Sequence, residues 1–299
     1  MNTPSKINKK INFNKISKVI LDVAEITKAS ANNHGCGNYK EFVDMLREWN
    51  VKLEIRDATA GENFSADNNT IIITDKDVNN EQKNSNKEDH ENINGCIIGY
   101  GSSYSGSAEH VIESLDGIDM QYLNMVHARY NNLPAFITET ERLYIREMSI
   151  SDLDEMYALY DTLSDNPFVE PLYEREEEEQ FSRNYIDNMY GFFQYGLWLV
   201  FRKSDSQLIG RVGIENREID GETRQELGYL IGSQYQRQGY GIEACKAVLE
   251  YGREYIGLQE IFLCTDHENK ASRCMAESLG FKDYANVHEF DILRKALLD

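Results

Sequence analysis

The sequence predicts an α/β chain with two domains: a small open-sheet α/β domain over residues 1–136, and an α+β domain over 137–299 whose mixed, mostly antiparallel sheet is flanked by helices. Three observations support this prediction. The 299 residues exceed the usual size of one domain, about 100–200 residues. Short β-rich runs alternate with helical periodicity in the first half, whereas the second half contains successive strands separated by tight turns. The segment 131–142, which contains Pro134, has the character of a linker.

The elements of the first domain follow from the spacing of apolar residues. Helices are expected over 39–49 and 119–130, where apolar side chains share one face. Near-continuous apolarity in the runs TIIIT and CIIGY predicts strands that are covered on both faces. The polar segment 76–94 has almost no apolar side chain and is expected to be a solvated loop. The predicted strands are 51–55, 70–74, 96–100 and 110–113.

The second domain is expected to begin with a strand at 143–147, followed by a helix with Ser151 as its N-cap. A longer helix is expected over 174–195, where the acidic residues at its start complement the positive end of the helix dipole. Turns are predicted at Ser204-Asp205 and Asp220-Gly221. The remaining predicted elements are strands at 196–202, 208–217, 224–232 and 260–265, and a helix that ends near residue 256.

Charge and composition argue against several classes of protein. The chain has 31 Lys and Arg against 51 Asp and Glu, a net charge of -20, which disfavours nucleic-acid binding. No apolar run approaches the roughly 20 residues of a membrane span, and the lysine-rich residues 1–18 lack the apolar core of a secretory signal. We therefore expect a cytoplasmic protein with no nucleic-acid or membrane partner. Five scattered cysteines have neither disulfide nor zinc spacing, so we expect reduced thiols and no metal.

A glycine turn lies between the strand that ends at Gly232 and the helix that follows. Unpaired backbone amides at a helix N-terminus suit a pyrophosphate, and the helix dipole adds to the attraction. Gly239 and Gly241 permit close backbone approach, and Arg237 adds a positive charge. On its own, the turn is also explained as an ordinary connection before a helix. Its residues are Gln236, Arg237, Gln238, Gly239, Tyr240 and Gly241.

The order of motifs around this turn resembles the GNAT superfamily of acetyl-CoA-dependent N-acyltransferases. Gln236, Gly239 and Gly241 match the pyrophosphate loop between the family's fourth strand and third helix. Downstream, residues 269–272 (NKAS) and 279–281 (LGF) match its N-x-x-S and L-G-F signature. The resemblance covers about residues 141–299 and implies a GNAT-type sheet with acetyl-CoA as cosubstrate. Through residues 140–147 and the strand QELGYLI, the nearest branch contains ribosomal-protein alanine acetyltransferase-like enzymes.

The resemblance and simple geometry assign roles to further residues. The backbone amides of Leu230 and Ile231 are expected to polarise the thioester carbonyl. Asn269 and Ser272 are expected to hold the pantetheine, although helix capping alone also explains them. Ala276 stands where many members of the family have the Tyr that protonates the leaving thiolate. Because a thiol has a pKa near ~8.5, the lack of this Tyr does not exclude catalysis.

A carboxylate or a water relay is needed to collect the proton that an attacking amine loses. We predict Glu226 in this role and Glu215 as the second candidate; the alternative for either is a solvent-facing strand acid. Phe193, Tyr195 and Trp198 are predicted to form the acceptor wall, because the family builds that wall near the turn before its second strand. Core packing explains these aromatic residues equally well.

The first half weakly resembles the C-terminal part of haloacid-dehalogenase-type phosphatases, through residues 71–75, 95–101 and 108–115. The nucleophilic D-x-D segment of those enzymes is absent, because Val23-Ala24-Glu25 follows Asp22. We therefore predict a non-catalytic domain used for folding, for a homodimer or for acceptor binding. His34 and Cys36 are better explained by a glycine-rich loop than by a nucleophile site, because no orienting acid accompanies them.

Together these patterns predict an N-acetyltransferase that moves an acetyl group from acetyl-CoA to a primary amine in a ternary complex, the acceptor being a small molecule or a protein N-terminus. The alternative is an acyl-CoA-binding sensor or interaction module without turnover. The second domain has 32 acidic and 17 basic residues, a net charge of -15, against -5 in the first. Such acidity attracts a cationic amine and repels CoA, whose binding then depends on nearby cations and a helix N-terminus.

Overall fold

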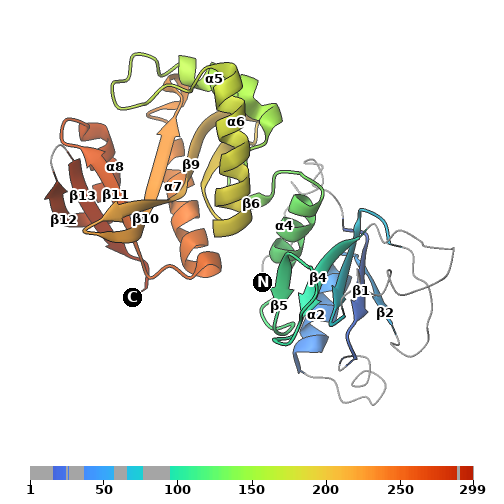
Figure 1. Cartoon of the computed structure of the whole chain (residues 1–299). Coiled ribbons are helices and arrows are strands. Elements are labelled where there is room, and N and C mark those ends of the chain that lie inside the picture. Colours follow the sequence, from blue (N-terminus) through green and yellow to red (C-terminus); the bar gives the residue numbers. More distant parts are fainter. Residues whose placement is uncertain are drawn as a thin grey trace. The chain divides into compact units, whose positions relative to one another are not determined.

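The structure of the protein is a computed structural model that describes residues 16–24, 26, 37–56, 66–76, 95–287 and 290–298. The chain divides into two compact units, Met1–Ala135 and Phe136–Asp299, each with its own sheet (Figure 1). Most of the predicted leader 1–18 and of the predicted polar loop 76–94 lies outside the described residues. The predicted loop around His34 and Cys36 also lies outside them.

The N-terminal unit contains a five-stranded sheet in which all neighbouring strands are parallel. The order β2-β1-β3-β4-β5 is typical of doubly wound sheets. β1 was not among the predicted strands, because its short apolar run directly follows the lysine-rich segment. The strands are β1 (Lys18–Asp22), β2 (Lys52–Ile55), β3 (Thr70–Thr74), β4 (Cys96–Tyr100) and β5 (His110–Ile112), and the helices are α2 (Gly37–Glu48) and α4 (Met120–Tyr130).

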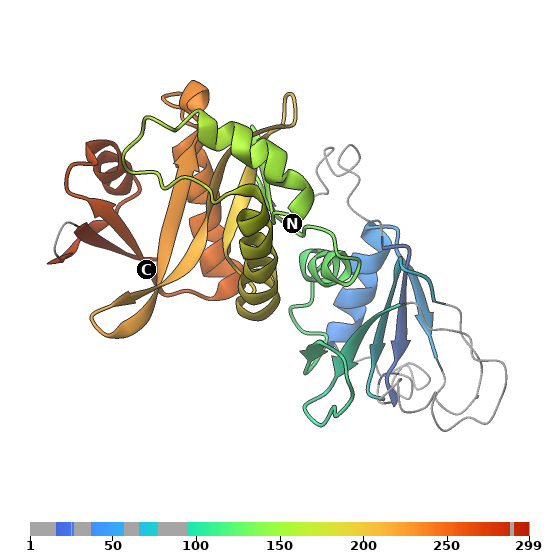
Figure 2. The same cartoon turned by 45° about the horizontal axis from the view of Figure 1, so that its top comes forward.

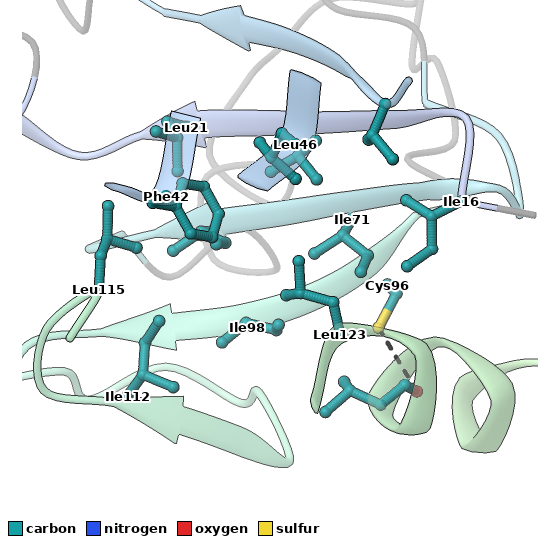
Figure 3. Close-up of a cluster of buried hydrophobic side chains, with 14 of the residues drawn as sticks. Ile16, Leu21, Phe42, Leu46, Ile71, Cys96, Ile98, Ile112, Leu115 and Leu123 are labelled. Carbon is teal, nitrogen blue, oxygen red and sulfur yellow. Dashed lines mark hydrogen bonds between the residues drawn. The ribbon is translucent and has the colours of Figure 1, made fainter. Parts of the chain in front are cut away.

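Helices α2 and α4 cover one face of this sheet (Figure 2). On that face Phe42, Leu46 and Leu123 pack into a common core with the inward-facing isoleucines of β3 and β4, which are Ile71, Ile73 and Ile98 (Figure 3). All five residues of β3 are buried, and Ile72 packs on the opposite face with Ile20. The prediction that β3 is covered on both faces is therefore confirmed.

The C-terminal unit contains an eight-stranded sheet in the order β12-β13-β11-β10-β9-β8-β7-β6. Only β10 and β11 pair in parallel, and the other neighbours are antiparallel, so the predicted mixed, mostly antiparallel sheet is confirmed. The strands are β6 (Phe136–Glu139), β7 (Leu143–Arg146), β8 (Leu197–Arg202), β9 (Gln207–Ile219), β10 (Glu222–Ile231), β11 (Glu260–Asp266), β12 (Lys282–Val287) and β13 (Phe290–Ala296).

Helices pack on both faces of this sheet. Tyr160 of α5 and Tyr185 of α6 reach side chains of β9 on one face, whereas α7 packs against Ile214 and Ile231 on the other. The helical segments are the 3-10 turn Ile150–Asp152 with α5 (Leu153–Asp161), α6 (Arg175–Tyr185) with its π-helical continuation Ile186–Phe193, α7 (Tyr240–Tyr251) with its π-helical continuation Gly252–Ile256, and α8 (Lys270–Ser278).

Three local predictions need correction. The helical segment before α5 has Ser149 as its N-cap, and not Ser151, because Asp152 accepts a 2.7 Å hydrogen bond from the Ser149 amide. The segment predicted as a linker contains β6, which pairs with β7. The helix predicted over 174–195 changes to π-helical geometry after Tyr185 and ends at Phe193, where Gln194 takes a positive φ of 67°. The Asp220-Gly221 turn is confirmed: both residues have positive φ, as a two-residue hairpin requires.

Candidate active site

The candidate site centres on a fork between two strands of the C-terminal sheet. β10 and β11 pair only at Glu226 and Phe262, after which they diverge. β10 therefore keeps an open edge from Leu227 to Ile231. On its other side β10 remains bonded to β9, and one of these bonds joins the Gly232 amide to the Ile209 carbonyl at 2.9 Å.

The hydrogen-bond alternation of an antiparallel pair decides which backbone amides of β10 face the fork. In this register the amide of Leu230 bonds to β9, whereas those of Leu227, Tyr229 and Ile231 face the β11 side. The single parallel pair with Phe262 uses the Leu227 amide, so those of Tyr229 and Ile231 are the ones that point into the fork. Two amides were predicted to polarise a carbonyl. The amide of Ile231 points into the fork, whereas that of Leu230 bonds to β9 and is not available to a ligand. An extended ligand along this edge would meet donors and acceptors placed as in a neighbouring strand.

The predicted pyrophosphate loop leads from the end of β10 to the N-terminus of α7. Gln236 begins it and donates through Nε2 to the Ile231 carbonyl at 2.8 Å, which ties the loop to the fork. Gly239 has a φ of +83°, a conformation that side-chain-bearing residues rarely adopt. A Cβ on Gly241 would lie 2.8 Å from Met275 Cε, so a glycine there allows α7 to approach α8 closely. Arg237 is exposed beside these glycines.

Arg142 and Glu243 brace this loop from outside the motif. Glu243 Oε1 accepts hydrogen bonds from the Thr140 hydroxyl at 2.5 Å and from the Arg142 amide at 3.1 Å. Arg142 Nε donates to Glu243 Oε2 at 2.7 Å, and its Nη1 donates to the Gln238 carbonyl at 3.1 Å. Although burial acts to raise it, the pKa of Glu243 is lowered by the hydrogen bonds from Thr140 and Arg142. Sequence reasoning missed this pair, because only the fold brings residue 142 to the start of α7.

Replacing Arg142 by Gln is expected to weaken CoA binding about tenfold, equivalent to ~1.4 kcal/mol. The substitution removes two charge-assisted hydrogen bonds that hold the loop before α7. Calorimetric titration with CoA measures the effect. Arg183→Gln is the matched control, because Arg183 forms an exposed ion pair with Glu179 on α6. Equal CoA affinity in the Arg142 variant and the wild type would show that the brace has no part in binding.

Asn269 and Ser272 meet at the start of α8. Asn269 Oδ1 accepts the Ser272 amide at 3.0 Å and so caps the helix, while the Ser272 hydroxyl accepts from the Tyr229 hydroxyl at 3.0 Å. Burial raises the pKa of Tyr229 to about 12. On the diverging part of β11, Thr265 keeps a buried hydroxyl that has no hydrogen-bond partner among the described residues. The open edge of β10, the glycine turn and this unsatisfied hydroxyl fit a long ligand with a phosphate end and amide groups.

Glu215 and Glu226 are direct cross-strand neighbours on β9 and β10. Glu226 lies in the fork: its Oε1 accepts the Cys264 amide of β11 at 3.1 Å, and its Oε2 is 3.1 Å from Arg217 Nη1. The Glu226 carboxylate therefore accepts the hydrogen bond that a backbone carbonyl of β10 would accept if the two strands stayed paired. Glu215 is held differently, because its Oε1 accepts a 2.9 Å hydrogen bond from the Tyr185 hydroxyl of α6.

The two carboxylates differ in their electrostatic surroundings. Burial raises the pKa of Glu215, the Glu226 charge adds to the rise, and the Tyr185 hydrogen bond and the Arg211 charge oppose it. Tyr185 in turn accepts the Leu197 amide at 2.6 Å, which fixes the position of its ring. Burial and the Glu215 charge raise the pKa of Tyr185 well above its usual value, so the hydroxyl stays protonated and keeps donating. Glu215 is thus a half-buried carboxylate without an ion pair among the described residues.

The three aromatic residues predicted as the acceptor wall do not share one face with Glu215. Trp198 is fully buried, and its ring packs against Tyr251 of α7 at 5.3 Å. Tyr195 is 8% exposed and donates at 2.7 Å to Asn216, whose side chain alternates with that of Glu215 along β9. Phe193 is 41% exposed and remains accessible. The face of Glu215 instead holds Tyr185, which no sequence motif marks.

The carboxyl edge of the N-terminal sheet contains a second group of charges. Asp22, at the end of β1, is buried and lies 2.9 Å from Lys76 Nζ and 3.5 Å from Arg56 Nη1. Asp75 accepts the Ala24 amide at 3.0 Å. No group of three or more possible metal ligands occurs among the described residues, and no described helix is long and apolar enough to cross a membrane.

Comparisons with known proteins concern the C-terminal unit. Residues 142–282 match the family model described as an acetyltransferase (GNAT) domain. Two relatives from Bacillus subtilis (strain 168) are each 28% identical: the uncharacterized protein YkkB over 144 residues (47% of this chain, 82% of its own), and the uncharacterized N-acetyltransferase YnaD over 143 residues (48% and 81%). The structure of a ribosomal-protein-S5-alanine acetyltransferase from Vibrio fischeri covers 53% of this chain and 95% of its own, with 17% identity and a TM-score of 0.46. The phosphatase resemblance of the first half finds no support in these comparisons and stays a prediction.

Proposed function

We propose that the chain is an N-acetyltransferase that transfers an acetyl group from acetyl-CoA to a primary amine by direct attack in a ternary complex. The match of residues 142–282 to the acetyltransferase (GNAT) model and the similarity to N-acetyltransferase-named relatives support acyl transfer. The observation that carries the proposal is the fork beside the glycine turn, with the carboxylate of Glu215 on the adjoining strand β9, directly opposite Glu226. The fork offers backbone groups to an extended ligand, and the turn offers the N-terminus of α7 to its phosphates.

Bound acetyl-CoA supplies an acyl group that is already activated as a thioester. The proposed task of the loop Gln236–Gly241 is to hold its pyrophosphate, with Arg237 as the added cation. Asn269, Ser272 and the open edge of β10 are proposed to hold the pantetheine. An amide on the fork side of β10, such as that of Tyr229 or Ile231, is proposed to polarise the reacting carbonyl.

Glu215 is the proposed base that takes the proton from the attacking amine. Its pKa is raised by burial, it has no ion pair among the described residues, and Tyr185 holds its carboxylate in one orientation. Glu226, which was ranked first on sequence, is bound by Arg217 and the Cys264 amide, so we propose a positioning role for it in keeping the fork open. Phe193 is the one member of the predicted acceptor wall that we retain as an acceptor contact.

The acceptor is proposed to be cationic, because the unit around the site has a net charge of -15. Raising the ionic strength from about 0.1 M to about 1 M shortens the Debye length from about 10 Å to about 3 Å. We therefore expect the KM of a diamine acceptor to rise several-fold while kcat changes little. A monoamine is the control and should show the smaller change. Equal KM values at both ionic strengths would exclude steering by the acidic surface.

Release of free CoA thiol from acetyl-CoA, measured with a panel of primary amines, tests the proposed reaction. Amine-dependent thiol release supports it. The alternative is an acyl-CoA sensor, and the observation in its favour is Ala276, which is buried where many family members have a catalytic Tyr. A sensor would bind CoA and yet release no thiol with any amine.

A further inference from the structure

A pocket of about 340 Å³ lies between α5 and the segment that leads to α6. Tyrosine rings and carboxylates dominate its lining: Tyr157, Tyr160 and Tyr173 are accompanied by Asp161 and Glu174. None of the described residues that line it is Lys, Arg or His. The volume is within the range of small-ligand sites, and the chemistry of the walls is that of a site for a cation.

Each of the three tyrosines is held by a contact with another segment of the chain. Tyr157 donates to the Tyr173 carbonyl at 2.6 Å, which ties α5 to the segment opposite. The Tyr160 hydroxyl accepts from Arg211 Nη1 of β9 at 2.9 Å. The Tyr173 ring lies 5.4 Å from that of Phe181 on α6. The walls are therefore preformed, which reduces the entropy cost of binding.

The two carboxylates at the pocket have no direct ion-pair partner among the described residues, although Arg211 and Arg175 lie behind its tyrosines. The carboxylates of Asp161 and Glu174 are exposed and form no ion pair or side-chain hydrogen bond with other described residues. Asp161 is also the last residue of α5, where the helix dipole adds negative potential. One cation already lies near the wall, because the Arg175 guanidinium is 5.7 Å from the centre of the Tyr157 ring. A ligand cation in the pocket would make the same kind of contact with the tyrosine rings that line it.

We propose that this pocket binds an ammonium or guanidinium group of the acceptor, separate from the amine that is acetylated. The proposal rests on the proposed function for its link to the acceptor. That link is physical: the Tyr173 ring contacts Phe181, the Phe181 ring lies 6.1 Å from that of Tyr185, and Tyr185 holds Glu215. The pocket and the proposed base Glu215 thus lie at the two ends of one row of aromatic rings. The acceptor is accordingly proposed to carry two or more cationic groups.

Tetramethylammonium is a suitable probe because it has no N–H group and cannot be acetylated. Calorimetric titration of the full chain should show binding of tetramethylammonium and none of neutral tert-butanol. Tyr157→Leu is expected to weaken the binding about fivefold to twentyfold, because it removes one ring of the cage. Asp161→Asn should weaken it about threefold and, as an exposed substitution, should leave folding intact. Asp165→Asn, on the same segment but outside the pocket, is the matched control and should change nothing.

Competition connects the pocket to the acceptor. Tetramethylammonium should raise the KM of a diamine in the wild type and should do so less in Asp161→Asn. Binding that is equal in all variants, or no effect on the diamine KM, would overturn the proposal. Amine-dependent thiol release without tetramethylammonium binding rejects the pocket and leaves the acetyltransferase function standing. Binding that depends on Tyr157 and Asp161, but without thiol release from any amine, rejects the function and leaves the cation site standing.

Discussion

Replacing Gly239 by Glu is expected to raise the CoA dissociation constant at least about 100-fold, equivalent to ~2.7 kcal/mol. The residue precedes α7 with a φ of +83°, so any side chain strains the turn, and a carboxylate there also repels a pyrophosphate. A Cβ at this position would lie 3.3 Å from Arg142 Nη2, which would also disturb the brace on the loop. Calorimetric titration with CoA measures the loss, and circular dichroism reports whether the fold is kept.

Gly221→Glu is the matched control. Gly221 has a φ of +77° in the β9–β10 turn, and a Cβ there would contact nothing within 4 Å. The control adds the same charge and a similar strain away from the fork, so it should leave CoA affinity unchanged. Tight CoA binding by the Gly239 variant would mean that the loop does not hold the pyrophosphate, and the cofactor assignment would have to be abandoned.

Replacing Glu215 by Gln is expected to lower kcat/KM for the amine by about 10² to 10³-fold with little change in CoA affinity. The variant keeps the hydrogen bond from Tyr185 but cannot take a proton. A base acts only when ionised, and burial raises the pKa of Glu215, so activity should fall as pH decreases through a value above that of an ordinary Glu. This acid limb should be missing in the variant, whereas the rise at higher pH that reflects the amine should remain.

Tyr185→Phe tests whether Glu215 titrates as the base of the reaction or has only a structural role. The Tyr185 hydroxyl stabilises the ionised form of Glu215, so its removal should raise the pKa further and move the acid limb to higher pH. Glu226→Gln is the companion variant and should weaken CoA binding, because Glu226 bonds to the Cys264 amide in the fork. It removes a charge that raises the pKa of Glu215, so the acid limb should remain but move to lower pH. If Glu226→Gln and not Glu215→Gln removed the acid limb, the sequence-based ranking of the two acids would be the right one.

Much of the fold could be predicted because it depends on local patterns. The glycines at 239 and 241 mark a turn before a helix, and the Asp220-Gly221 pair marks a hairpin, since few other residues take positive φ. The apolar run of β3 marks a strand that is buried on both faces. The lysine-rich surroundings of β1 concealed it, although it lies inside the parallel sheet.

The side chains of the site were harder to predict because they depend on which face of the sheet each residue occupies. Helices cover both faces of the C-terminal sheet, so both sets of alternating positions on β8 are apolar, and parity alone does not show which face Trp198 joins. On β9 one set carries Arg211 and Glu215, but the sequence does not show which helix covers that face. The Tyr185 hydroxyl reaches Glu215 across 30 residues, and Arg142 reaches Glu243 across 101. Such pairings become visible only when the strand order is known.

The amides of β10 that point into the fork have no neighbouring strand, and this has a consequence for how the site is encoded. A backbone N–H is the same whatever side chain its residue bears, so the recognition offered at Tyr229 and Ile231 belongs to positions and not to residue types. It arises because β11 turns away after a single pair. Substitutions at these two positions that keep the strand would preserve both donors. The backbone donors of the fork therefore depend on the order and divergence of the strands, and no sequence motif marks them.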